Sequence, residues 1–186
     1  MVLKRLVDEA ILRRDQTMEL EVFDRNTAAL RLYERAGFVR FDRLLGFEKA
    51  TANATPVAAP SWNSLPLSAL PADAGNDDAL PWQLRSPSLL QMPEPWQLVH
   101  DGDGAYAIVD LLTDTAVLLR LLYIAPEARG RGQARPLLSA IERYAAGRPI
   151  RAAQLVPSAL GPFAEGLGFR PMELFQWRMK LNLAAG

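Results

Sequence analysis

The sequence predicts an α/β protein of the α+β kind, with a mixed, largely antiparallel sheet flanked by helices. Two observations support this: residues 1–49 show the pattern of helix, strand, helix and strand, and residues 96–182 show strands around a glycine-rich turn and a helix. Hydrophobic residues make up 49% of the 186 positions, which is enough to bury one core, or one core plus an attached fragment.

The composition excludes several classes of function. Lys and Arg balance Asp and Glu at 21 each, so no net positive charge attracts nucleic acid, and we expect no such partner. The sequence has no cysteine, which excludes disulfides, thiolate metal sites and a covalent cysteine-acyl intermediate, and we expect no metal. No apolar stretch is long enough to span a bilayer, so we expect no membrane partner and a cytoplasmic location.

The first 49 residues contain four predicted elements. A helix opens the chain, since apolar residues recur there at helical spacing: Val2, Leu3, Leu6, Val7, Ala10 and Ile11. A strand follows where residues 18–22 alternate between apolar and acidic side chains. Asn26 offers an N-cap to a second helix, which Gly37 ends. A strand with Leu45 and Phe47 on one side closes the segment near Glu48.

Residues 50–95 differ in composition from the rest of the chain. They are rich in Ala, Thr, Pro, Ser and Asn, which predicts a linker over 50–60 and irregular or short helical structure after it. Trp62, Trp82 and Trp96 lie in or directly after this region, and a solvated tether would not normally carry three indoles. We therefore expect the later part to pack onto a domain with the tryptophans as anchors, and stacking on a ligand is the alternative.

Three antiparallel strands are predicted next, at 96–99, 105–112 and 116–124. Asp101-Gly102-Asp103-Gly104 between the first two is typical of a hairpin turn. A glycine-rich turn at 125–134 then leads into a helix with an apolar face made by Leu137, Leu138, Ile141, Tyr144 and Ala145.

That turn has the features of an anion site. A helix N-terminus carries unpaired N–H groups and a partial positive charge, and glycines let the backbone approach a pyrophosphate without obstruction by Cβ atoms. Gly130 and Gly132 supply the glycines, and Arg129 and Arg131 add full charges. A plain turn in an unrelated α/β domain is the alternative, because Gly-x-Gly also occurs in ordinary loops.

The motif Arg129-Gly130-Arg131-Gly132-Gln133-Ala134 resembles the Arg/Gln-x-x-Gly-x-Gly/Ala signature of the GCN5-related N-acetyltransferase (GNAT) superfamily. Residues 122–127 resemble the strand end that precedes this signature, and residues 163–169 resemble the family's Phe/Leu-Tyr-Glu-x-x-Gly-Phe motif. The resemblance covers residues 96–182, including an expected strand at 150–156 and a final strand carrying Phe175, Trp177, Met179 and Leu181.

The N-terminal segment resembles the later half of the same family. Residues 21–26 and 32–38 match it more closely than the second copy does, and the Gly-Phe pairs at 37–38 and 168–169 lie 131 residues apart, close to one domain length. We therefore expect a tandem arrangement whose first domain has lost its front strands and phosphate loop. It consists of a partial GNAT domain at 1–49, a linker at 50–60, and a GNAT domain at 61–186 with its phosphate loop at 129–134.

The resemblance implies an acetyl-CoA-dependent N-acetyltransferase. It places the pantetheine arm of CoA against the backbone of Leu122, Tyr123 and Ile124, beside the strand that starts near Ile150. It places the pyrophosphate on the turn formed by Arg129, Gly130, Arg131, Gly132, Gln133 and Ala134. Without cysteine, the acetyl group would pass directly to a small-molecule or protein amine in a ternary complex.

Each copy lacks part of the family's catalytic pattern. In the C-terminal copy, Ala164 stands at the position of the tyrosine that often serves as the acid, and Pro157-Ser158 replaces the usual asparagine. The N-terminal copy keeps Tyr33 and Asn26 but has no phosphate loop.

No catalytic acid or base is therefore identified. Tyr106, Asp110 and Tyr33 are the candidates, and a structural role is the alternative for each of them. His100, the only histidine, lies beside the hairpin turn, and we expect an exposed loop residue there.

Two functions stay open from the sequence. The glycine-rich turn favours an active N-acetyltransferase, whereas the missing tyrosine favours a noncatalytic GNAT-fold module for CoA binding or assembly. The residues that choose an acceptor are expected within 60–95. The apolar faces of the N-terminal segment also need a cover, either from the C-terminal domain in one continuous sheet or, as we prefer, from a second chain in a homodimer.

Overall fold

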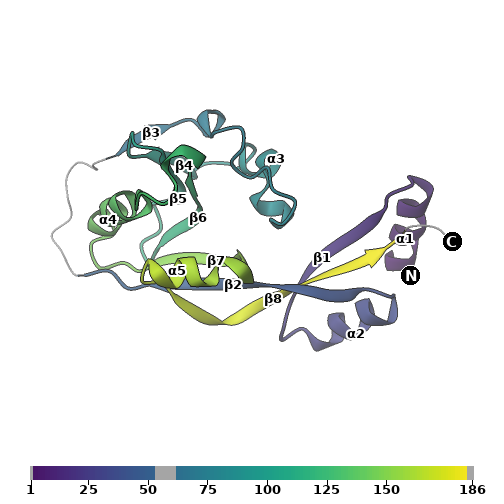
Figure 1. The fold of residues 1–186 in the computed structure, drawn as a ribbon. Helices are drawn as coiled ribbons and strands as arrows, with labels where there is room; N and C mark the ends of the chain where they lie inside the picture. The colour runs from purple at the N-terminus through teal and green to yellow at the C-terminus, as the bar shows by residue number, and fades with distance from the viewer. Residues whose placement is uncertain (1, 53–61, 184–186) are drawn as a thin grey trace.

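A computed structural model describes residues 2–52 and 62–183. Within these residues one eight-stranded sheet runs through the molecule in the order β1-β8-β2-β7-β6-β5-β4-β3 (Figure 1). The strands are β1 (Thr17–Phe23), β2 (Val39–Lys49), β3 (Asn63–Leu65), β4 (Gln97–His100), β5 (Ala105–Asp110), β6 (Val117–Ile124), β7 (Ile150–Pro157) and β8 (Arg170–Asn182). Only β6 and β7 pair in parallel, which confirms the mixed, largely antiparallel sheet.

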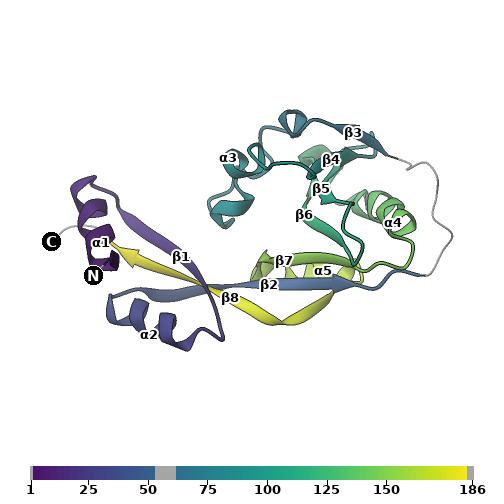
Figure 2. The ribbon, with the colours of Figure 1, turned by 180° about the vertical axis from the view of Figure 1, so that it is seen from behind.

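Helices flank this sheet on both faces. The α-helices are α1 (Val2–Leu12), α2 (Thr27–Arg35), α3 (Ser86–Leu89), α4 (Ala134–Ala145) and α5 (Gly161–Gly166). Short 3-10 helices complete the connections: η1 (Leu67–Ala69), η2 (Trp82–Leu84), η3 (Pro126–Ala128) and η4 (Ser158–Leu160). Figures 1 and 2 show α4 and α3 on opposite sides of β5 and β6.

The N-terminal segment folds in the predicted order. Asn26 caps α2, because its Oδ1 accepts a hydrogen bond from the backbone N–H of Ala29 at 3.1 Å. Gly37 follows the helix with a φ of +92°, a conformation that a side chain disfavours. Both α1 and α2 pack on one face of β1 and β8, in a small core centred on Val22, Leu30, Phe38 and Met179.

The two long strands β2 and β8 join the halves of the molecule. β2 lies between β7 and β8, and β8 lies between β1 and β2. Leu44 pairs with Gln176 and Leu45 with Phe175, and positions 44 and 45 correspond to 175 and 176 under the 131-residue spacing of the Gly-Phe pairs. The pairing is therefore symmetric about this point, and each long strand contributes to both ends of the sheet.

This arrangement covers the N-terminal strands within one chain. β1 pairs with β8 along its whole length, so one continuous sheet, which was the less favoured of our two expectations, is what the structure contains. The homodimer stays a prediction, and α1 exposes the apolar side chains of Val2, Leu6, Ile11 and Leu12. The tandem arrangement and the domain boundaries also stay predictions, since most of the 50–60 linker lies outside the described residues.

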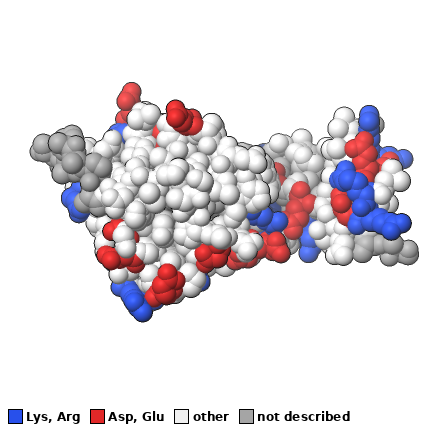
Figure 3. Space-filling view, turned by 90° about the horizontal axis from the view of Figure 1, so that it is seen from above, with Lys and Arg blue, Asp and Glu red and all other residues white. Residues whose placement is uncertain are grey.

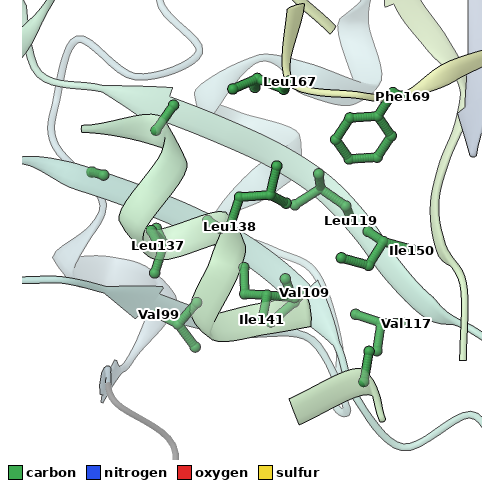
Figure 4. Close-up of a cluster of buried hydrophobic side chains, with 14 of the residues drawn as sticks. Val99, Val109, Val117, Leu119, Leu137, Leu138, Ile141, Ile150, Leu167 and Phe169 are labelled. Carbon is green, nitrogen blue, oxygen red and sulfur yellow. The ribbon is translucent and has the colours of Figure 1, made fainter. Parts of the chain in front are cut away.

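The main core lies between the sheet and α4. Figure 4 shows Leu137, Leu138 and Ile141 of α4 beside side chains of four strands, including Val99, Val109, Val117, Leu119 and Ile150. Phe47 of β2 is fully buried in the same core, although it belongs to the N-terminal segment. The C-terminal half is therefore packed partly by residues that precede the linker.

Residues 66–96 cover the opposite face of the sheet. Leu70, Leu84 and Leu89 pack there against Leu98 and Ile108, so the later part of this region packs onto a domain as predicted. The three-residue strand β3 was not predicted, because so short a segment carries no alternation to detect.

Trp62 and Trp96 pack against the core as anchors, whereas Trp82 is 61% exposed. Trp62 meets Tyr144 of α4 edge to face, with ring centroids 5.4 Å apart. The indole Nε1 of Trp82 donates to Glu21 of β1 at 3.0 Å. Trp96 packs against the core that contains Leu98 and Ile108, and its ring also lies under the guanidinium of Arg120 and beside a cavity.

Charged residues are unevenly spread over the molecule. Figure 3 shows both signs side by side at the α1 end, whereas most of the broad surface at the opposite end is uncharged, with charged residues along its edges. Among the described residues, no helix is long and apolar enough to cross a membrane.

Candidate functional site

The site is built on the place where β6 and β7 part. These parallel strands pair only at their starts, and Leu119 with Ala152 is the last pair. β6 nevertheless runs on to Ile124 and β7 to Pro157, so within the described residues the later part of β6 has no strand partner on this side. An open strand edge of this kind can bind an extended ligand through backbone hydrogen bonds.

A bulge in β6 lies at the same place. Ile108 of β5 pairs with Leu121 and Val109 pairs with Leu119, which leaves Arg120 without a partner in the β5–β6 ladder. A bulge bends its strand and redirects the side chain of the extra residue. Arg120 thus stands at the apex of the opening between β6 and β7.

A pocket of about 410 Å³ occupies this opening. Its wall is mostly apolar and includes residues from both faces of the sheet: Phe47, Leu167 and Phe169 from the α4 side, and Leu80 and Leu84 from the opposite side. The pocket therefore passes through the sheet, and two ligands could meet in it from opposite faces. Arg120, Tyr123 and Arg129 are the ionisable residues among the described ones that line it.

The glycine-rich turn opens next to this pocket, between η3 and α4. Gly130 and Gly132 have φ values of +72° and +79°, which only glycine adopts readily. A Cβ atom added at either position would meet nothing within 4 Å, so the space over the turn is free. No side chain caps the N-terminus of α4 among the described residues. Free N–H groups under an open glycine turn fit a pyrophosphate.

The arginines of the turn have different surroundings. Arg129 Nε donates to the carbonyl oxygen of Ile124 at 3.0 Å, so this side chain holds the turn against the end of β6 while lining the pocket. Arg131 is exposed. Arg135 on the first turn of α4 donates to the carbonyl oxygen of Gly166 at 2.8 Å and so links α4 to α5.

Tyr123 joins the site to the segment that covers it. Its side chain is 9% exposed, and its hydroxyl donates a hydrogen bond to the carboxylate of Asp73, between η1 and η2. Burial, followed by the hydrogen bond and negative charge of Asp73, raises the pKa of Tyr123 to about 12, although Arg129 opposes this shift. The phenol therefore keeps its proton throughout the physiological range.

The titration of Tyr123 can be measured directly. We expect one of the four tyrosines to ionise near pH 12 in ultraviolet absorbance, and this late step to be absent in Tyr123→Phe. Because the folded pKa lies above the ordinary value of about 10, the stabilisation is complete below pH 10 and is lost as the pH rises toward 12. If wild type and variant titrate alike, the buried Tyr123–Asp73 contact does not form in solution.

Several solved structures of GCN5-related N-acetyltransferases have the same architecture. A GCN5-related N-acetyltransferase from Sphaerobacter thermophilus aligns with 91% of this chain at a TM-score of 0.54 and 18% identity. Another from Kribbella flavida aligns with 98% of the chain and 74% of its own length, at a TM-score of 0.55 and 16% identity. The fold is that of the GNAT superfamily. A conserved protein of unknown function from Staphylococcus epidermidis is similar too, with a TM-score of 0.61, 9% identity and 97% of this chain aligned.

These likenesses concern the fold alone. The chain spans only 61% of the length of the Sphaerobacter protein. Its sequence matches no protein-family model and no curated protein. Any activity must therefore be argued from the site itself.

The structure brings the predicted cofactor-binding residues together. Leu122, Tyr123, Ile124 and Arg129 line the pocket, and residues 130–134 form the turn at its side. Their binding role stays a prediction, but their common location is what such a role requires.

The three catalytic candidates do not come together. Tyr33 packs against Phe38 in the core under α1 and α2, with ring centroids 5.9 Å apart. Asp110 lies opposite Leu118, where β6 and β7 are still paired, and its Oδ1 accepts the N–H of Leu112 at 2.9 Å. Tyr106 lies beside Tyr123, but its ring stacks on His100 and does not line the pocket. The contacts of all three residues are those of structural residues.

Sequence reasoning missed two polar residues of the site. Asp73 is 50 positions from Tyr123, and no local pattern predicts that pairing. Arg120 did carry a signal, because it is the one charged residue in the otherwise apolar strand that begins at Val117. Among residues 2–52 and 62–183, no group of three or more metal-ligating side chains is found.

Proposed function

We propose that this chain is an acetyl-CoA-dependent N-acyltransferase that acts on an amine. The observation that carries the proposal is the opening between β6 and β7 beside the glycine turn at the N-terminus of α4. An extended thiol ester with a pyrophosphate at one end fits an open strand edge followed by an anion cradle. The passage through the sheet lets an amine approach from the other face.

The residues of the site have separate tasks in this proposal. The backbone amides of 130–134 hold the pyrophosphate, and the free edge of β6 at 122–124 holds the pantetheine arm. When bound, acetyl-CoA supplies an activated acetyl group. The C–S bond of the thioester breaks and an amide bond forms, and the proton that the amine loses balances the proton that the CoA thiol gains. An N–H on β6 stabilises the charge on the carbonyl oxygen.

The pocket offers few side chains that could serve as the general acid and the general base. No Asp, Glu or His among the described residues lines the pocket. A phenol with a pKa of about 12 transfers its proton unfavourably to a thiolate, whose conjugate thiol has a pKa near 8.5 in cysteine, so Tyr123 is a poor acid here. Water must then carry these protons, and we expect slow turnover.

The lack of an acid and a base among the described residues of the pocket favours a second candidate function, a noncatalytic CoA-binding module. Ala164 on α5 lines the pocket, and its methyl group supplies no proton where the family often has a tyrosine. Binding of CoA alone needs only the turn and the strand edge, both of which are present.

Release of free CoA thiol with a panel of amines separates the two candidates. We expect slow release by the native chain and an increase of about tenfold or more in kcat for Ala164→Tyr, because a positioned general acid contributes roughly 10²–10⁴-fold in other enzymes. Phe163→Tyr is the matched control, since it adds a phenol to the neighbouring pocket residue and should leave kcat unchanged.

Two other outcomes are informative. If the native chain turns over rapidly and Ala164→Tyr does not change kcat, the general acid lies elsewhere and the noncatalytic module is excluded. Tight CoA binding without release in either protein, for any amine, would leave the noncatalytic module as the function.

A further inference from the structure

Arg120 is a half-buried cation that has no carboxylate partner among the described residues. Its Nε is buried and has no hydrogen-bond partner among the described residues, and no carboxylate of those residues lies within ion-pair distance of it. Its guanidinium carbon lies 4.9 Å from the ring centroid of Trp96. Burial lowers the pKa of this group, but a guanidinium stays charged in proteins.

Two other arginines, the buried Arg178 and the half-buried Arg148, have hydrogen-bond partners. Arg178, which is 3% exposed, donates to Glu19 at 2.9 Å and to the carbonyl oxygen of Ala79. Arg148 donates to the carbonyl oxygens of Leu111 and Thr113. A buried donor without a hydrogen-bond partner costs folding free energy, so the unsatisfied Nε of the half-buried Arg120 needs another reason.

Arg120 also separates two cavities. It lines the large pocket between β6 and β7 and a second one of about 230 Å³ on the side of Trp96. The second cavity is also lined by the amide of Gln154 and by Arg151, whose Nε is engaged by Glu48 at 2.5 Å, and no Asp or Glu among the described residues lines it. Its polar groups are therefore suited to an anion.

We infer that Arg120, stacked on Trp96, binds a carboxylate of the acceptor, so that the substrate is a small amine that also carries a carboxylate, such as an amino acid. This inference rests on the proposed function. The amine would reach the large pocket while the carboxylate meets the guanidinium at the apex of the opening, where a planar fork of donors can engage both oxygens. The apolar wall around Leu80 and Leu84 fits an apolar side chain.

Binding of reaction products tests the inference without requiring turnover. Calorimetry on the full chain compares N-acetylphenylalanine with its carboxamide, which has the same shape and no charge. We expect the carboxylate to bind at least about tenfold more tightly, and Arg120→Met to abolish the difference while leaving CoA affinity unchanged.

Two further variants keep this test independent of misfolding. Arg120→Lys retains the charge and should restore part of the preference for the carboxylate. Arg151→Met removes a donor of the same cavity that is already engaged by Glu48 at 2.5 Å, and it should change the preference by no more than about threefold. Equal binding of both products by the native chain, or a preference that survives Arg120→Met, would overturn the inference.

Transfer assays separate this inference from the proposed function. Phenylalanine and phenylalaninamide differ in amine pKa, so the readout is the change in their kcat/KM ratio between native chain and Arg120→Met. A loss of about tenfold in that ratio supports the inference, and an unchanged ratio contradicts it. If the native chain binds N-acetylphenylalanine more tightly than its carboxamide but releases no CoA, the proposed transferase activity is wrong and Arg120 remains a carboxylate-binding residue.

Discussion

Replacing Gly132 with valine should remove measurable CoA binding, with an affinity loss of at least about hundredfold. Gly132 has a φ of +79°, which a β-branched residue adopts only with strain, so the turn would relax and redirect its amides. The space over Gly132 is empty in the structure, and a valine side chain would also occupy the path of a pyrophosphate. Calorimetric titration with CoA measures the effect.

Gly102→Val is the matched control for this change. Gly102 has a φ of +91° and open space at its Cβ, so valine there should impose similar backbone strain in the 101–104 hairpin. It lies outside the glycine-rich turn, and its CoA affinity should stay within about twofold of the native value. Equal losses in both variants, or a loss in neither, would exclude the turn as the pyrophosphate site.

Phe47→Ala should lower the free energy of unfolding by about 3–5 kcal/mol, the usual cost of removing a buried phenylalanine. Phe47 is fully buried between β2 and the core under α4, and it also lines the large pocket. The residue belongs to the N-terminal segment at 1–49, so a loss of this size shows that the C-terminal half depends on β2. Urea unfolding of the full chain gives the value.

Phe41→Ala provides the comparison on the same strand. Phe41 is 43% exposed and has the guanidinium of Arg178 at 4.7 Å from its ring, so its removal should cost no more than about 1.5 kcal/mol. If the two substitutions cost the same, β2 is not part of the core in solution.

Local signals predicted most of the elements. Asn26 and Gly37 mark the two ends of α2, and the hairpin at 101–104 fixes the order of β4 and β5. Each of these features depends on hydrogen bonds or backbone angles within a few residues, which is why a single sequence reveals them.

The pairing of β2 with β8 could not be predicted in this way. Leu45 and Phe175 pair in adjacent strands although they lie 130 positions apart, and either a second chain or the same chain could have supplied the partner. The contact of Tyr123 with Asp73 and the bulge at Arg120 are likewise set by tertiary packing. The glycine turn and strand edge that we propose for CoA were therefore visible in the sequence, while the residues that we propose for the acceptor were not.

The most direct test of the account is a calorimetric titration of acetyl-CoA into the native full chain. The open edge of β6 and the glycine turn predict one saturable site per chain, with a Kd between about 1 μM and 1 mM, the range usual for enzyme substrates. Absence of saturable binding up to about 5 mM acetyl-CoA would contradict the account, because the open edge of β6 and the glycine turn would then not form a CoA site.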